Sequence, residues 1–321
     1  MIVVDLDVGT ISRTRLAVSP LAEATAWLRL AVGGRRHPVF GDAGAAARDA
    51  LGDPDVALLA QVVPAGGTGY LPDLLTPKPA LSKRVLDTQL QHVREASTDD
   101  TYEQVCKLRF GACAMPRPVR RSVDDGSFAA RAANGLQRFW RAAIADGWGS
   151  LLQTLQADIA EKADSMARTG VGGVLGSLHP SVGWDGAMLA IHLPPYDERT
   201  SFVDAELVLA PSVLGWPGVS PQLCNPAQAV LRYPVRAAGT ASRLDRPGAL
   251  AALVGTTRSA LLRDLEVSRS TAALSERHRL APATISYHLG VLHRAGLVLR
   301  SRDRHTVLYR RSPQADALLN V

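Results

Sequence analysis

Residues 270–311 have the sequence STAALSERHRLAPATISYHLGVLHRAGLVLRSRDRHTVLYRR, and this stretch decides the fold of the C-terminal part of the chain. Pro282 suits the first position of a helix, because its fixed φ is helical and its missing N–H is not needed there. From it, Ile285, Leu289 and Leu292 follow at spacings of four and three residues, which places them on one buried stripe. The pattern therefore predicts a helix that begins at Pro282.

The residues after this helix predict a hairpin. Gly296 supplies the left-handed position that commonly ends a helix. Two alternating runs, 297–300 and 306–310, then enclose the polar and cationic segment 302–305, as in a β-hairpin. Asp303 is the residue expected at positive φ in the turn, since Asp tolerates that conformation better than most residues. Helix, turn, helix and basic hairpin form the order of a winged helix-turn-helix, which predicts DNA binding.

The predicted DNA contacts lie on the exposed face of the second helix and on the hairpin. Small and polar side chains near a helix N-terminus allow its first turns to reach base edges in the major groove. The predicted contacts are Pro282, Ala283, Thr284, Ser286, Tyr287, His288, Arg294, Arg302, Arg304 and His305. The alternative is a helical hairpin and a β-ribbon that only pack against the rest of the chain and carry solvated arginines.

The distribution of charge favours DNA binding over that alternative. From Pro247 to Val321 the chain has 11 Arg, no Lys and 5 Asp or Glu, a net charge of +6. The whole chain also has a net charge of +6, since the preceding residues hold 25 basic and 25 acidic groups. A positive excess confined to one small domain is the expected arrangement for binding a phosphate backbone.

The same residues carry a family resemblance. Residues 284–289 (TISYHL), 291–292 (VL) and 295–298 (AGLV) resemble the T-[VI]-S-x-H-L, V-L and A-G-L-V signature of the ArsR family of transcriptional regulators. Residues 271–275 resemble the first helix of its helix-turn-helix and 307–311 the closing strand of its wing, so that the likeness covers about the last 70 residues. The resemblance implies a repressor that acts as a homodimer on a palindromic operator in double-stranded DNA, with terminal helices at the dimer interface.

A weaker likeness extends further back in the chain. Residues 210–212 and 231–236 resemble stretches of a long, poorly characterised N-terminal domain in an actinobacterial subgroup of these regulators. The chain also departs from the family pattern, because Ala281 stands where relatives place a capping Ser or a similar residue before the second helix. The lost cap costs about 1 kcal/mol.

Metal sensing finds no support in the sequence. The helix-turn-helix region contains no cysteine, and the final segment 312–321 has Asp316 but no histidine, so the ligand pairs of metal sensors in this family are missing. Cys106, Cys113 and Cys224 are too scattered for a ligand set, and we expect buried, inert thiols. The alternative for Cys106 and Cys113 is a redox role on one helix face. We expect no metal, no cofactor and an organic effector.

Length and composition indicate a cytoplasmic protein of two domains. The chain has 321 residues, of which 46% are hydrophobic and 21% charged, an ordinary composition for soluble proteins. No run approaches 18 apolar residues, and the N-terminus lacks the basic start and apolar core of a signal peptide. We therefore expect no membrane partner.

The domain boundary is predicted in the aperiodic segment 237–246, between an N-terminal domain at 1–240 and the winged domain at 247–321. The N-terminal domain is expected to bind an effector or to organise the dimer. Its pattern is α+β. The expected helices are 20–30, 81–94, 98–110 and 150–168, and the expected strands are 1–8, 186–193, 205–210 and 229–235.

No catalytic constellation is recognisable in the N-terminal domain. Residues 170–176 (GVGGVLG) follow a helix and not a strand, so a linker or turn is expected there in place of a phosphate loop. His179, Asp185 and His192 match no known ligand spacing, and we expect solvated or structural side chains. Tryptophans 140, 148, 184 and 216 are expected in the core, although an apolar ligand pocket would use the same residues.

The chain is predicted not to be an enzyme. The alternatives are an enzyme with a regulatory winged domain and a protein-interaction module that has lost DNA binding.

Overall fold

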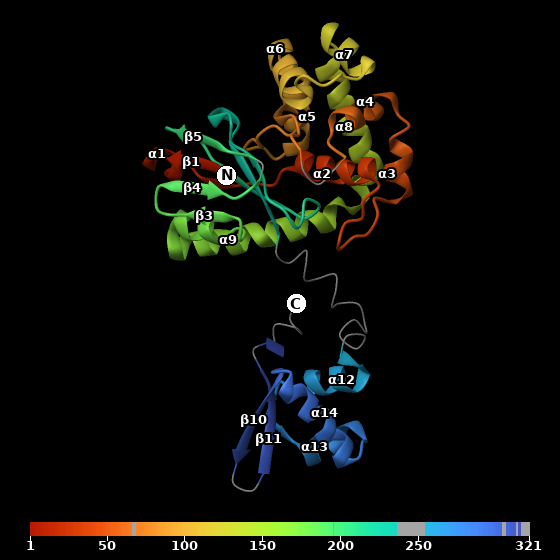
Figure 1. Cartoon of the computed structure of the whole chain (residues 1–321), viewed down its shortest axis with the longest axis vertical. Coiled ribbons are helices and arrows are strands. Elements are labelled where there is room, and N and C mark those ends of the chain that lie inside the picture. Colours follow the sequence, from red (N-terminus) through yellow and green to blue (C-terminus); the bar gives the residue numbers. More distant parts are fainter. Residues whose placement is uncertain (66–68, 195, 236–253, 304–305, 313, 316–321) are drawn as a thin grey trace. The chain divides into compact units, whose positions relative to one another are not determined.

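The computed structural model describes residues 1–321 except 66–68, 195, 236–253, 304–305, 313 and 316–321. The chain divides into two compact units, Met1–Ala238 (unit 1) and Gly239–Val321 (unit 2). Both units contain helices and strands (Figure 1), so the fold class is α+β as predicted.

The first sheet of unit 1 places the N-terminal strand between strands from much later in the chain. Its order is β3-β4-β1-β5, with β3 at Val182–Trp184, β4 at Met188–Ile191, β1 at Ile2–Leu6 and β5 at Glu198–Phe202. Val4 of β1 is fully buried and lies opposite Leu189 in an antiparallel pair and Thr200 in a parallel pair. The N-terminus of the chain is thereby joined in one sheet to strands within residues 182–202.

The second sheet of unit 1 has the order β2-β6-β8-β7. Its strands are β2 at Arg15–Leu16, β6 at Val208–Ser212, β8 at Val230–Pro234 and β7 at Ser220–Gln222. β6 and β8 are parallel, and every residue of both is buried. Such burial on both faces is typical of parallel strands with nearly continuous apolar sequence. Arg232 is the exception in β8, since it is charged and only 7% exposed.

The helices of unit 1 lie mainly between residues 20 and 177. They are α1 at Val8–Ser12, α2 at Pro20–Gly33, α3 at Gly44–Ala50, α4 at Pro54–Val62, α5 at Val85–Arg94, α6 at Thr98–Thr101, a π-helix at Tyr102–Phe110, α7 at Arg117–Asp124, α8 at Phe128–Ala143 and α9 at Trp148–Ser177. Short 3₁₀ turns occur at Asp73–Leu75, Ala145–Gly147 and Pro226–Gln228. α2 begins as its sequence predicts, because the Ser19 hydroxyl accepts a hydrogen bond from the Ala22 N–H and Pro20 takes the first helical position.

Helix α9 corrects the prediction of a linker at residues 170–176. The helix bends at Gly170, whose φ of 72° and ψ of 173° are not helical, and then continues to Ser177. Gly172 is required by close packing, since a Cβ there would lie 2.5 Å from Nε1 of Trp184 on β3. The glycines of this stretch therefore serve a bend and a helix-to-sheet contact, which a sequence pattern cannot distinguish from a turn.

Unit 1 has two main apolar cores, and α9 contributes to both. Leu155 lies in the core formed chiefly by the helices, and Val174 and Leu175 lie in the core formed against the sheets. Figure 1 shows α9 extending from the sheets to the region of α8.

Several other predicted features of unit 1 need correction. The helix expected from residue 81 begins at Val85, and α9 continues well past its expected end. Cys113 and Cys224 are exposed and Cys106 is half-buried, so the prediction of buried thiols is wrong for the first two. The π-helix ends at Phe110, before Cys113, and the two cysteines expected on one helix face do not share a helix.

Unit 2 has the predicted winged helix-turn-helix arrangement. Its elements are α12 at Thr256–Asp264, β9 at Arg269–Ser270, α13 at Thr271–His278, α14 at Pro282–Arg294, β10 at Val298–Asp303 and β11 at Thr306–Arg311. α14 begins at Pro282 as predicted, and Ile285, Leu289 and Leu292 are buried in a core with Leu274 of α13. β10, β11 and the short β9 form a three-stranded sheet.

The hairpin differs from its prediction at Asp303. This residue is the last of β10 and pairs with Thr306, so the strand extends further than the alternating apolar pattern indicated. The prediction that Asp303 belongs to the turn is therefore wrong. Arg304 and His305, two of the predicted DNA contacts, lie outside the described residues. Among the helices that are described, none is long and apolar enough to span a bilayer.

Candidate functional site

The outer face of α14 presents most of the predicted DNA contacts to solvent. Ile285, Leu289 and Leu292 turn inward, and the remaining side chains of the first turns are exposed because successive residues lie about 100° apart around the helix. The exposed predicted contacts are Pro282, Ala283, Thr284, Ser286, Tyr287 and Arg294. This face can enter a groove without any rearrangement of the core.

Tyr287 and His288 form an edge-to-face pair at the middle of this helix. Their ring centroids lie 5.4 Å apart at an interplanar angle of 67°. Tyr287 is 65% exposed, whereas His288 is half-buried and its Nδ1 is buried without a hydrogen-bond partner among the described residues. Of the two, Tyr287 is the side chain that projects from the surface.

The N-terminus of α14 has no side-chain cap. Ala281 occupies the capping position and offers only its carbonyl, which accepts from the Thr284 and Ile285 N–H groups. α13 contrasts with it, because the Ser270 hydroxyl accepts from the Ala273 N–H. The side-chain cap that the sequence lacks at position 281 is thus also missing from α14 in the structure.

Asp264 holds α12 and α13 together and neutralises part of the basic charge of unit 2. Its carboxylate accepts from Nε of Arg277 at 2.7 Å and from Nε2 of His278 at 3.1 Å, and Arg269 lies 3.4 Å away. Burial works to raise the pKa of Asp264, but the hydrogen bonds and charges of these partners outweigh it and hold the pKa below its ordinary value. Arg269, Arg277 and His278 therefore contact a carboxylate within their own unit, which is a structural role.

The wing carries cations that are not neutralised in this way. Arg300 and Arg302 lie two residues apart on β10, hence on one face of the strand, and both are exposed. Within the described part of unit 2, neither forms an ion pair, whereas Arg311 lies 3.8 Å from Glu266. Among the described residues, Arg302 is therefore an exposed cation without a carboxylate partner.

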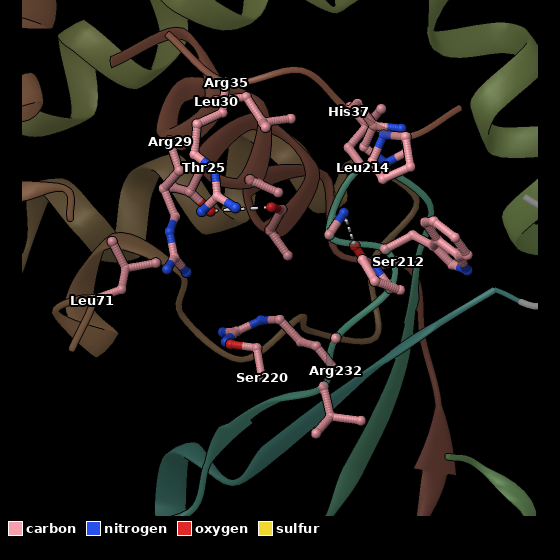
Figure 2. A pocket seen from close by; sticks show the side chains of 18 of the residues that line it. Thr25, Arg29, Leu30, Arg35, His37, Leu71, Ser212, Leu214, Ser220 and Arg232 are labelled. Carbon is pink, nitrogen blue, oxygen red and sulfur yellow. Dashed lines mark hydrogen bonds between the residues drawn. The ribbon is translucent and has the colours of Figure 1, made fainter. Parts of the chain in front are cut away.

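Unit 1 contains a cavity that the sequence did not predict. It has a volume of about 360 Å³ and lies between α2, the segment after it and the residues that connect β6 to β7. Figure 2 shows Arg29, His37, Ser212 and Arg232 around it. A second cavity of about 310 Å³ shares Arg29, Leu71, Val219, Ser220 and Arg232 with the first.

Two signals in the sequence could have indicated this cavity. Residues 35–37 (RRH) form a basic cluster directly after the glycines that end α2, and Arg232 is the one charge within the apolar segment 229–235 (AVLRYPV). A charged residue in a strand that is otherwise apolar is a candidate for a buried polar role.

The histidine and aspartate residues at 179, 185 and 192 have local roles. Nδ1 of His179 accepts from the Ser181 N–H, and Asp185 accepts from the Ala187 and Met188 N–H groups, so that both stabilise their own turns. Across the ranges that the structure describes, no group of three or more His, Cys, Asp or Glu could hold a metal ion.

Part of unit 1 matches a family whose function is not known. Residues 120–239 match the model described as "Family of unknown function (DUF5937)". The matched range includes both stretches, 210–212 and 231–236, that resemble the long N-terminal domain. Among curated proteins, none matches the chain.

Three solved structures are similar to a part of the chain. Reduced HlyU from Vibrio cholerae is 32% identical over 22% of this chain and 77% of its own, with a TM-score of 0.21. A double mutant of Lactococcus lactis ZitR in its apo form is 25% identical over 22% of this chain and 57% of its own, with a TM-score of 0.21. A second structure of HlyU from Vibrio cholerae is 28% identical over 23% of this chain and 90% of its own, with a TM-score of 0.20. The chain is similar to these proteins over about a fifth of its length.

Proposed function

We propose that the chain is a sequence-specific, DNA-binding transcriptional regulator of the cytoplasm, and that it represses as a homodimer on a palindromic operator. The observation that carries this proposal is the coincidence of the exposed α14 face with the positive charge of the chain. Residues 247–321 of unit 2 carry a net charge of +6, equal to that of the whole chain. The exposed face of α14 presents small polar groups and Arg294, and Arg302 is exposed on β10. Groove-reading helices need both properties, since phosphate contacts supply affinity and base contacts supply specificity.

The proposal assigns unit 1 to effector binding or to organisation of the dimer, and it assigns the chain no catalytic activity. The effector is organic in this proposal. Operator release should therefore not follow stoichiometric addition of zinc, cadmium, copper or arsenite, and release at micromolar metal would overturn this part.

Binding of the full chain to the DNA upstream of its own gene tests the proposal. Fluorescence anisotropy should show tighter binding to this DNA than to a scrambled duplex of equal length. Ser286→Glu should abolish the difference, because it places a carboxylate on the exposed face of α14 where phosphates and base acceptors would approach. Ser150→Glu is the matched control, since Ser150 is an exposed serine of α9 in unit 1. Equal affinity for both duplexes, or unchanged binding by the Ser286 variant, would refute the proposal.

A further inference from the structure

The second cavity of unit 1, of about 310 Å³, has the size of a small-molecule site and charges of both signs in its wall. Among the described residues of the wall, Arg29 and Arg232 are cationic, and Asp73 and Glu198 are anionic. The charge of the wall is therefore balanced. A ligand with a single charge would be attracted by one part of this wall and repelled by another, whereas a ligand with both charges can match it.

Asp73 presents a carboxylate that no described residue satisfies. The side chain is half-buried at the first position of a 3₁₀ turn, and it accepts no hydrogen bond from a described residue. Burial raises the pKa of Asp73 from 3.8 to about 6, the charge of Arg232 opposes this, and the like charge of Glu198 adds to it. A cationic group beside Asp73 would compensate both the burial and the repulsion.

Glu198 extends the negative side of the wall. It is exposed on β5, and its Oε2 accepts a hydrogen bond of 3.5 Å from Sγ of Cys224, another residue of the wall. Burial and the charges of Glu198 and Asp73 raise the pKa of Cys224 to about 11, so the thiol stays neutral. Asp73 and Glu198 thus act on the same space, and neither forms an ion pair with a cation in the described part of unit 1.

Arg232 supplies the positive side of the wall and is held in place by protein groups. It donates to the Thr76 carbonyl at 3.0 Å, to Oγ1 of Thr76 at 2.7 Å and to Oε1 of Gln222. All three bonds use Nη2, and Nε is buried without a partner among the described residues. Burial lowers the pKa of Arg232 to about 10, so the guanidinium remains charged near neutral pH. Its Nη1 remains as a donor for a ligand.

Asp73 and Arg232 act on each other without contact. Each favours the charged form of the other, but the two side chains form neither an ion pair nor a hydrogen bond. Opposite charges that face a partly buried space are screened less than charges at the surface, so a group that contacts both is stabilised. An α-amino acid carries an ammonium and a carboxylate on one carbon atom, and it can contact both residues at once.

Leucines supply much of the apolar part of the wall, at positions 71, 108, 193 and 223. Leu108 lies on the π-helix and is 51% exposed. A ligand with an apolar side chain would cover Leu108, and the removal of this apolar surface from water would favour binding. The wall therefore matches a dipolar head group joined to an apolar side chain.

We propose that this second cavity binds a zwitterionic amino acid with an apolar side chain, whose ammonium group lies beside Asp73 and Glu198, whose carboxylate accepts from Arg232, and whose side chain packs on the leucines of the wall. The site does not depend on DNA binding. Within the proposed regulator this amino acid would be the effector, and that role alone rests on the proposed function.

Calorimetric titration of the full chain, without DNA, tests the site with L-leucine and L-phenylalanine. Isocaproate and hydrocinnamate are the matching probes without an ammonium group, and isoamylamine and phenethylamine are those without a carboxylate. We expect at least one of the two amino acids to bind with one site per chain. Both of its analogues should bind at least about tenfold more weakly, because each lacks the hydrogen bonds of one charged group.

Alkylation of cysteine locates the binding without any substitution. Cys224 is exposed in the wall of the cavity, and Cys113 is exposed outside it. A saturating concentration of the amino acid should slow the modification of Cys224 by N-ethylmaleimide at least about threefold, because the reaction requires access to the sulfur. The modification of Cys113, measured in the same sample by mass spectrometry, should not change.

Two variants test the two parts of the ligand. Asp73→Asn keeps the size of the side chain and removes its charge, and it should weaken the amino acid at least about tenfold. Asp146→Asn is the matched control, because Asp146 is exposed and lies outside the wall. Leu108→Ser should weaken the amino acid at least about threefold by removing apolar contact. Leu81→Ser is its control, since Leu81 is 86% exposed and also lies outside the wall.

Four results would overturn the proposal. They are an absence of saturable binding by either amino acid up to about 10 mM, an analogue that binds within about threefold of its parent, unchanged alkylation of Cys224 at saturation, or wild-type affinity in both Asp73→Asn and Leu108→Ser. If Asp73→Asn lowers the melting temperature of unit 1, Leu108→Ser decides, since its side chain is half exposed. No measurement involves DNA, so a failure here is distinct from a failure of the proposed function.

Discussion

The phenolic hydroxyl of Tyr233 donates a hydrogen bond of 2.7 Å to Oδ2 of Asp158, and this bond joins β8 to α9 inside unit 1. Both residues are buried, at 1% and 6% exposure, and Nζ of Lys162 lies 3.9 Å from the other carboxylate oxygen. Burial raises the pKa of Tyr233 above its ordinary value, and the charge of Asp158 raises it further, so the hydroxyl keeps its proton. A neutral donor thus satisfies a buried carboxylate.

Tyr233→Phe should destabilise unit 1 by about 1–3 kcal/mol, because the carboxylate of Asp158 would lose a buried donor. All five tryptophans lie in unit 1, so urea unfolding followed by tryptophan fluorescence reports this unit alone. Tyr102→Phe is the control, since Tyr102 is 60% exposed. Equal unfolding free energies for the two variants would show that the bond contributes nothing.

Glu23 should make the stability of unit 1 depend on pH. Its buried carboxylate accepts from the N–H groups of Leu214 and Val213, but burial dominates and raises its pKa from 4.5 to about 7. The pKa of Glu23 is therefore higher in the folded state than in the unfolded state. The stabilisation that protonated Glu23 gives to unit 1 is fully present below about pH 4.5 and is lost as the pH rises through 7.

Glu23→Gln removes this titration and keeps an oxygen acceptor. Relative to that variant, the wild-type unit should lose roughly 3 kcal/mol of unfolding free energy between about pH 4.5 and 8. Tryptophan fluorescence in urea at several pH values measures the difference. Glu103→Gln, a change at an exposed position, should leave the wild-type pH profile as it is. A constant difference between wild type and Glu23→Gln across this range would contradict the argument.

Leu289→Asp should unfold unit 2, because it places an unpaired carboxylate in the stripe with Ile285 and Leu292 at a cost of several kcal/mol. Leu299→Asp is the matched control, since Leu299 is 54% exposed on β10. Amide hydrogen exchange of residues 256–303 and 306–311 should lose protection in the first variant and retain it in the second. Protection retained in Leu289→Asp would mean that the helix phase assigned to α14 is incorrect.

Tyr287→Ala should reduce the preference for operator over random DNA by about 1–3 kcal/mol, if its exposed ring makes a direct base contact. Dissociation constants for both DNAs measure the ratio. Tyr102→Ala, which removes a similarly exposed tyrosine from unit 1, should not change it. A specificity ratio that does not respond to Tyr287→Ala would move base reading to Ala283 and Ser286.

Arg302→Ala should weaken binding to operator and random DNA alike. It should also reduce the slope of log affinity against log salt by about 0.9, the value for one lost phosphate contact. Arg84→Ala removes an exposed arginine from unit 1 and serves as the control for net charge. If the two variants have the same salt slope, Arg302 does not contact phosphate.

The sequence predicted unit 2 far better than unit 1, for a physical reason. In α14, the interior stripe, the first-position proline and the terminal glycine all indicate the same boundaries, and each acts within a few residues. In unit 1 the decisive interactions join distant positions. β1 pairs with strands at 188–202, and the short or polar strands β2, β3, β5 and β7 have no pattern of their own.

The cavity was missed for the same reason. Its wall combines Arg29 and His37 with Arg232, and no local periodicity connects residues that are about 200 positions apart. The buried carboxylate of Asp158 on α9 could not be predicted either, because its hydrogen-bond donor, Tyr233, lies 75 positions later in the chain. The outer face of α14 followed from the sequence, since exposure on a helix is fixed by the same spacing that buries the opposite side.

The shared helix α9 determines how unit 1 can come apart. Leu155 belongs to one core, Val174 and Leu175 belong to the other, and the bend at Gly170 lies between them. Loss of either core would expose part of a helix that the other core needs for its own burial. The two cores should therefore melt together in a single cooperative transition, and unit 1 should behave as one folding unit although its apolar interior is divided.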